Sequence, residues 1–192
     1  MKKRTIALAG AAAFLFAGIG LAMHPYAKDA PQASVTSQHD FMEDRIFDEA
    51  FHCTKDRKES MLATQSILKA AKEEQVSPSL LAALVEMESG FLSTTIDEDG
   101  NAGFMQISQK TADAMQMDRN NPEENIRIGA RMLRHYMYDF PMEDQKRLEE
   151  SAVIAYLYGE DAMKDYQENQ EINEEMASVI EKYRAIQNRL NR

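Results

Sequence analysis

Cysteine is almost missing from this 192-residue chain, and tryptophan is missing altogether. With Cys53 as the single cysteine, no disulfide can form within the chain. A thiol beside His52 could indicate a nucleophile, but nothing else in the sequence supports that role, so we interpret it as a packed or partly exposed spectator. The four histidines are scattered, and no pair has the spacing of a metal site. The sequence therefore predicts neither a metal nor a cofactor.

Several classes of protein are excluded by other absences. The chain has no G-x-S-x-G, Walker or H-E-x-x-H motif, and no strong run of alternating residues that would predict strands. Lysine and arginine total 22 against 32 acidic residues, which gives a net charge of −10 and a pI near 4.9. Such an acidic chain has no electrostatic footprint for nucleic acid. Nucleic acid is therefore not an expected partner.

The first residues have the form of an export signal. Lys2, Lys3 and Arg4 precede the uncharged run Thr5–Met23, and small residues would allow cleavage after Ala22 or Ala27. We expect a periplasmic or secreted protein. The run also approaches the ~20 residues that span a bilayer, so an uncleaved anchor is the alternative, and a membrane is a partner only in that case. Residues 1–27 are thus a signal peptide or an anchor.

The rest of the chain suits one domain of ordinary size. We expect residues 28–58 to form a linker and an accessory helix over Asp40–Cys53, and residues 59–192 to form the domain. Apolar residues at three-to-four spacing predict most of its helices. The expected ranges are Glu59–Gln75, a helix beginning at Pro78, Asn121–Asp139, Glu149–Tyr158, and a final apolar stripe over Ile172–Leu190.

One glutamate stands where the pattern calls for an apolar residue. Ser77 and Pro78 read as a helix start, and Gly90 can end that helix in a left-handed conformation. Glu88 then falls in the last turn, on the face that carries Leu81, Leu84 and Val85. Apolar surroundings and the negative end of the helix dipole both raise the pKa of a carboxyl there. The pattern alone agrees equally with a general acid and with an exposed glutamate at a frayed helix end.

Two motifs carry a resemblance to a known family. Glu88–Phe91 reads E-S-G-F, and Gly100–Gln106 reads G-N-A-G-F-M-Q. Together they resemble the catalytic core of the lysozyme-like soluble lytic transglycosylases, and the resemblance extends over roughly Glu59–Leu190. It implies a mostly α (α+β lysozyme-like) fold, a single helical domain with a substrate cleft and a short hairpin near Thr94–Gly103.

The resemblance also implies roles for particular residues. Glu88 takes the place of the catalytic acid. The implied substrate-binding residues are Ser89, Phe104, Met105, Gln106, Tyr156 and, on a loose match, Glu171. The chain departs from the family where A-Y-N-A-G is usual, because Leu157 and Tyr158 follow the tyrosine.

The implied reaction is cleavage of the β-1,4 bond between N-acetylmuramic acid and N-acetylglucosamine in peptidoglycan, with formation of 1,6-anhydromuramoyl ends. A lysozyme-type hydrolase of the same bond is an alternative, with Asp97 or Asp99 as the second carboxyl. A weakly active peptidoglycan-binding component of a secretion, conjugation or flagellar machine is another, motivated by Leu157 and Tyr158.

Overall fold

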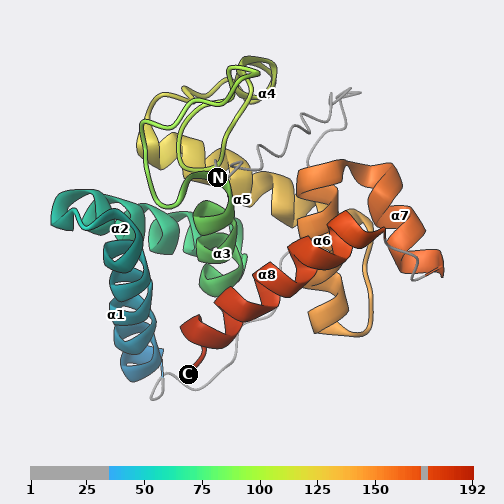
Figure 1. Cartoon of the computed structure of the whole chain (residues 1–192), viewed down its shortest axis with the longest axis horizontal. Coiled ribbons are helices and arrows are strands. Elements are labelled where there is room, and N and C mark those ends of the chain that lie inside the picture. The colour runs from blue at the N-terminus through green and yellow to red at the C-terminus, as the bar shows by residue number, and fades with distance from the viewer. Residues whose placement is uncertain (1–34, 170–172) are drawn as a thin grey trace, which may run out of the picture.

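The computed structural model describes residues 35–169 and 173–192 (Figure 1). Within these ranges all regular structure is helical, which confirms the mostly α fold class. The helices are α1 (Val35–Thr54), α2 (Arg57–Glu74), α3 (Pro78–Ser89), α4 (Gln109–Met115), α5 (Pro122–Asp139), α6 (Gln145–Tyr158), α7 (Glu160–Asn169) and α8 (Glu174–Leu190). The export segment and Glu171 lie outside the described residues.

Side-chain caps set where the helices begin. Asp56 accepts from the backbone N–H groups of Lys58 and Glu59, so α2 begins two residues before its expected start. Asp144 caps α6 in the same way, and this helix begins at Gln145 rather than at Glu149. The short helices α4 and α7 were not predicted, because each is too brief to show a clear apolar period.

Helix α3 lies in the middle of the described helices, with α1 and α2 on one side and α6 and α7 on the other (Figure 1). All residues from Leu80 to Val85 are fully buried. A helix that is apolar on all sides is expected to be buried on all sides, and α3 is apolar over most of its length. The core therefore forms around α3 and holds its last turn in a fixed place.

Helices from both ends of the chain pack on this core. Ile46 and Ala50 of α1 are fully buried, so the accessory helix shares the core of the domain. At the other end, the buried residues of α8 are Val179, Ile180, Tyr183, Ile186 and Leu190. The final apolar stripe thus packs on the domain, against α3, α6 and α1.

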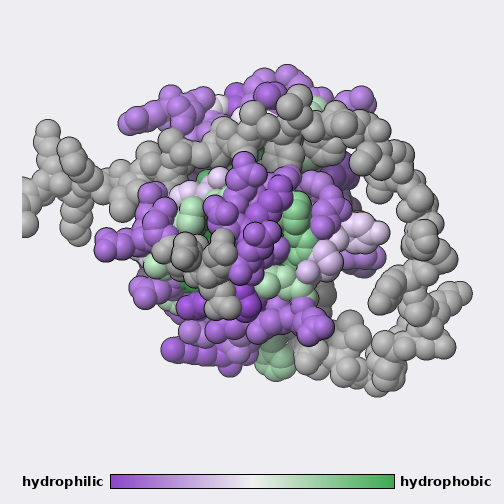
Figure 2. Space-filling model, turned by 90° about the vertical axis from the view of Figure 1, so that its right-hand side faces the viewer, coloured by the Kyte–Doolittle hydropathy of each residue, from purple (hydrophilic) through white to green (hydrophobic). Residues whose placement is uncertain are grey.

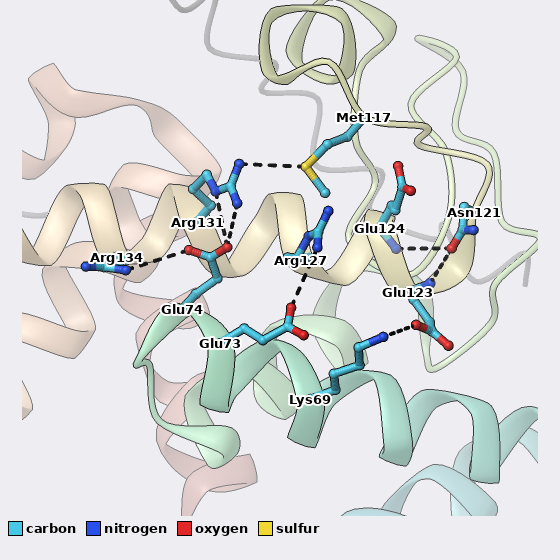
Figure 3. A network of polar contacts seen from close by, with 10 residues as sticks. All are labelled: Lys69, Glu73, Glu74, Met117, Asn121, Glu123, Glu124, Arg127, Arg131 and Arg134. Atoms are coloured by element: carbon cyan, nitrogen blue, oxygen red, sulfur yellow. Dashed lines mark hydrogen bonds and ion pairs between the residues drawn. The ribbon is translucent and has the colours of Figure 1, made fainter. Parts of the chain in front are cut away.

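Ion pairs join α2 to α5 (Figure 3). Glu74 is almost fully buried; its Oε1 lies 2.8 Å from Nη2 of Arg131, and its Oε2 lies 3.9 Å from Nη1 of Arg134. Lys69 and Glu123 form a further pair at 2.6 Å, beside a cavity of about 130 Å³ that polar side chains line. These contacts fix α5 against α2, and α5 in turn supports the loop that follows α3.

The surface agrees with the acidic, polar composition. Hydrophilic side chains cover most of the coloured face in Figure 2, and apolar residues show only in patches between them. None of the helices in residues 35–169 and 173–192 combines the length and the apolar character needed to cross a bilayer.

Candidate active site

Glu88 lies in the last turn of α3, as the sequence predicts. Ser77 caps the start of the helix and Pro78 occupies its first turn. Gly90 ends it in the left-handed region (φ 61°, ψ 34°), and its N–H donates to the carbonyl of Glu86 at 3.0 Å. Phe91 follows with a positive φ of 62° and a fully buried side chain. The chain therefore turns sharply after Glu88 and anchors the turn in the core.

The Glu88 carboxyl has no hydrogen-bond or ion-pair partner within the described part of the chain, although the residue is half-buried. Burial raises its pKa to about 8, the negative charge of Asp97 adds to this shift, and the positive charge of Lys182 opposes it. At neutral pH the carboxyl is mostly protonated. It can therefore donate a proton to a leaving group, which is the requirement for a general acid.

Asp97 is held in the loop that faces this carboxyl. Its Oδ1 accepts from the backbone N–H groups of Asp99 (3.0 Å) and Asn101 (2.8 Å), and its Oδ2 accepts from the side-chain amide of Asn101 (2.8 Å). The acceptor positions of this carboxylate are thus largely used to form a turn. Asp99 is exposed and donates its N–H to Asp97.

The loop itself is a folded ribbon of single β-bridges. Ile96 pairs with Ala102, and Ala102 also pairs with Ile107, both antiparallel. The N–H of Gly103 donates to the carbonyl of Thr95 at 2.9 Å. A hairpin was expected near Thr94–Gly103; the described residues show its turn and its pairing, without a regular strand.

Asn125 of α5 joins this loop to the helical core, and sequence reasoning missed it. Its side chain is fully buried, accepts from the N–H of Met105 (2.8 Å), and donates to the carbonyls of Ala102 (2.7 Å) and Arg119 (2.8 Å). Gly103 has a φ of 81°, and a Cβ there would lie 2.4 Å from the Asn125 amide. The glycine is therefore required by both conformation and space.

A signal for Asn125 is present in the sequence. An amide lies four residues before Gly129, on the apolar face of α5, where burial requires a hydrogen-bond partner. Arg119 was also missed. Its Nη1 donates to the carbonyls of Gly100 (2.6 Å) and Ile107 (3.1 Å), so it links the two ends of the loop. Nothing in the local pattern distinguishes this arginine from a surface one.

Phe104 and Met105 have fully buried side chains. Met105 packs against Gly129 so closely that a Cβ on that glycine would lie 2.4 Å from the Met105 methyl carbon. Direct contact between a glycan and either side chain is not available in this arrangement. Their assignment as substrate-binding residues stays a prediction, and their visible role is to anchor the loop.

Gln106 and Ser89 both donate hydrogen bonds to backbone carbonyls. The Gln106 amide donates to the carbonyls of Thr95 (3.1 Å) and Gly103 (2.8 Å), and this residue has a φ of 47°. The Ser89 hydroxyl donates to the carbonyl of Val85 at 3.1 Å. Ser89 directly follows the candidate acid in α3, and Gln106 fixes the shape of the loop that follows this helix. A role in binding substrate stays a prediction for each.

Tyr156 connects α6 to the same place. Its hydroxyl donates to the carbonyl of Met105 at 2.6 Å, and the residue is almost fully buried. Burial raises the pKa of Tyr156 well above its usual value, and the charge of Glu88 contributes, which places the two side chains near each other. The structure thus brings Glu88, Ser89, Phe104, Met105, Gln106 and Tyr156 together.

The two residues that depart from the family pattern, Leu157 and Tyr158, are the last two residues of α6. Leu157 is buried in the core, so an asparagine there would place an amide among apolar side chains. Tyr158 is half-buried, and burial together with the neighbouring Glu175 carboxylate raises its pKa to about 12.

The surroundings of Cys53 do not favour a catalytic role for its thiol. The thiol is near Glu49 and Glu86, whose carboxylates both bind Arg189 at 2.8 Å. Partial burial raises the pKa of Cys53, and the charges of Glu86 and Glu49 raise it further. A thiol with a raised pKa is a weak nucleophile near neutral pH, which favours the spectator interpretation.

The described residues thus place an unpartnered carboxyl with a raised pKa at the end of a central helix, beside a short braced loop, and such a carboxyl has the property that a general acid needs. The sequence profile of the Transglycosylase SLT domain matches residues 65–179, more than half of the chain. The chain therefore belongs to this family, which connects it with lysozyme-like cleavage of peptidoglycan in general. No curated protein sequence matches the chain.

Proposed function

We propose that the protein is a peptidoglycan lytic transglycosylase that cleaves the β-1,4 bond between N-acetylmuramic acid and N-acetylglucosamine. The observation that carries this proposal is the state of Glu88. It is a carboxyl without a partner among the described residues, with a pKa raised to about 8, on the turn that carries the family motif.

In the proposed reaction Glu88 first donates its proton to the leaving glycosidic oxygen as the bond to the muramoyl C1 breaks. The acetamido group of the substrate supports the positive charge that develops at C1. Glu88 is then a carboxylate and accepts the proton of the muramoyl C6 hydroxyl, whose oxygen bonds to C1 and closes the 1,6-anhydro ring. The carboxyl regains its proton, and no water is consumed.

This route needs one catalytic carboxyl, whereas most glycosidases use two. Asp97 is the carboxylate whose charge acts on Glu88, and it accepts three hydrogen bonds within its own turn. Few of its acceptor positions are left to orient a water. The single-carboxyl route is therefore favoured over the lysozyme-type alternative, which would release reducing ends.

The test is digestion of purified sacculi, with the products identified by mass spectrometry. We expect 1,6-anhydromuramoyl products from the wild type, and a loss of at least ~10⁴-fold in rate for Glu88→Gln, because the residue serves as both acid and base. Glu86→Gln is the matched control, since Glu86 is two residues away and pairs with Arg189. Reducing-end products would favour the hydrolase, and binding of sacculi without cleavage by either protein would favour a binding component.

We also propose that the protein acts in the periplasm or outside the cell, where peptidoglycan is found. The support is the basic start and apolar run of residues 1–23. Intact mass of envelope fractions is the measurement, with a mature protein beginning near Met23 or Lys28 as the expected result. A full-length, membrane-bound main form would replace the cleaved signal by an anchor. Work within a secretion, conjugation or flagellar machine rests on analogy with small family members alone.

A further inference from the structure

A row of three charged residues runs along one face of α8. Glu175, Lys182 and Arg189 are seven residues apart, so they lie two turns apart and nearly in line, about 10 Å from one to the next. All three lie at the edge of the stripe by which α8 packs on the domain. The row therefore follows the boundary between α8 and the helices beneath it.

The two ends of this row have partners that fix its direction. Arg189 donates from Nη2 to both oxygens of Glu86 in α3, at 2.8 and 3.1 Å. Glu175 lies beside the hydroxyl of Tyr158, at the end of α6. The row thus extends from the last turns of α3 to the last turn of α6, which are the two helix ends that carry Glu88 and Tyr156.

Lys182 is the middle member, and it differs from the other two. It is exposed, and no described residue forms a hydrogen bond or ion pair with it. Glu88 lies within reach of its charge, two residues beyond the glutamate that holds Arg189. A protein with a net charge of −10 thus exposes an ammonium group, unpaired among the described residues, whose charge acts on its candidate acid.

A glycan strand offers one kind of anion to such a group. Its sugar rings are neutral, and its carboxylates belong to the muramoyl side chain, either as the free lactyl group or within the stem peptide attached to it. We propose that Lys182 binds a carboxylate of the muramoyl residue and thereby positions the scissile bond at Glu88. This inference rests on the proposed function, because it names the part of the substrate that the same site recognises.

The experiment compares Lys182→Gln with Lys182→Arg and with Lys72→Gln, which removes an exposed lysine from α2 and changes the net charge equally. The substrates are soluble glycan strands that bear stem peptides, and strands freed of them by an amidase. For Lys182→Gln we expect KM to rise about 10-fold with little change in kcat, since a charge-assisted hydrogen bond is lost. Lys182→Arg should recover most of the affinity, and Lys72→Gln should match the wild type.

The two substrates identify the source of the carboxylate. An effect confined to the stem-bearing strands assigns a peptide carboxylate, and an effect confined to the freed strands assigns the lactyl group. Equal losses of kcat on both strands, together with a shifted pH profile and an unchanged KM, would overturn the proposal, because Lys182 would then act only on the protonation of Glu88.

A binding measurement separates this inference from the proposed function. The dissociation constant of stem-bearing and freed strands is measured in the Glu88→Gln background, with chitin oligosaccharides as a neutral probe that has no carboxylate. Addition of Lys182→Gln should weaken binding of at least one kind of strand about 10-fold and leave chitin binding unchanged. An unchanged constant for both kinds of strand sinks the inference, even if the wild type cleaves sacculi. Conversely, if the wild type cleaves nothing but Lys182→Gln still weakens strand binding, the Lys182 site stands and the proposed enzymatic function falls.

Discussion

Glu88 and Glu150 both interrupt the apolar face of a helix, but they differ in the hydrogen-bond partners that the structure gives their carboxyls. Each lies on an apolar helix face: Glu88 ends the face of α3, and Glu150 begins the face of α6 that continues with Val153, Ile154 and Leu157. Glu150 is 1% exposed, and Arg184 donates to both of its oxygens at 2.7 and 2.8 Å, while the Tyr166 hydroxyl donates at 2.8 Å. Glu88 has none of these partners among the described residues.

The difference shows what decides the charge of a carboxyl within this fold. Burial raises the pKa of both groups. At Glu150 the hydrogen bonds from Arg184 and Tyr166 outweigh burial and lower the pKa below its usual value. At Glu88 burial acts together with the charge of Asp97, and the opposing charge of Lys182 is too weak to reverse them, so the pKa is raised to about 8. Glu150 thus joins α6, α7 and α8 as an anion, whereas Glu88 keeps a proton for chemistry.

The largest expected effect comes from making Glu150 resemble Glu88. Arg184→Met removes the cation and leaves the buried carboxylate with the Tyr166 hydroxyl as its remaining hydrogen-bond donor, which should lower the free energy of unfolding by about 3–5 kcal/mol at pH 7.5. Urea denaturation followed by circular dichroism measures it. Glu150→Gln should cost less, because Arg184 is about half exposed and can turn to water.

The pH dependence of this variant provides the decisive comparison. In the wild type the folded pKa of Glu150 is lowered, so its contribution to stability is present above the unfolded pKa and is lost as pH falls through the folded pKa. In Arg184→Met the Arg184 hydrogen bonds and charge no longer offset burial, so the folded pKa of Glu150 should rise, and the stability deficit should shrink between pH 7.5 and pH 5. A deficit that grows on acidification would mean that Glu150 is not the source of the loss.

The helices of the fold were largely predictable, and the reason is visible in α3 and α8. Both carry long apolar faces, and Ser77, Pro78 and Gly90 also mark the ends of α3, so the burial of both helices follows from periodicity. The short helices α4 and α7 were not, because seven and ten residues give too few turns to establish a period. The early start of α6 depends on the Asp144 cap, which precedes a polar turn without apolar periodicity.

The candidate site was predictable only in part. The position of Glu88 follows from one interrupted apolar face and one glycine, and both features are local in sequence. Other features of the site depend on residues far apart in the sequence. Asn125 bonds to Met105 and Arg119 bonds to Gly100, 20 and 19 positions away. The charge of Lys182 acts on Glu88 from a different helix. Local patterns do not record such long-range contacts. They depend on how α5 and α8 pack, which only the folded chain determines.

Glu88→Gln should change stability less than Arg184→Met does, but it tests the raised pKa of Glu88 directly, because the amide cannot titrate. The folded pKa of Glu88 is about 8, above that of an unfolded glutamate, so the folded state binds the extra proton and stability falls as pH rises between about 4.5 and 8. The variant should therefore match the wild type at pH 4 and exceed it at pH 9 by about 1–3 kcal/mol, once solvent screening is allowed for. Urea midpoints at the two pH values measure this gain. Glu98→Gln serves as the control, since Glu98 is an exposed glutamate whose replacement should leave the free energy of unfolding nearly unchanged at both pH values. A Glu88→Gln variant that gains nothing at pH 9 would show that the carboxyl ionises freely in the folded protein, and its assignment as a general acid would lose its physical basis.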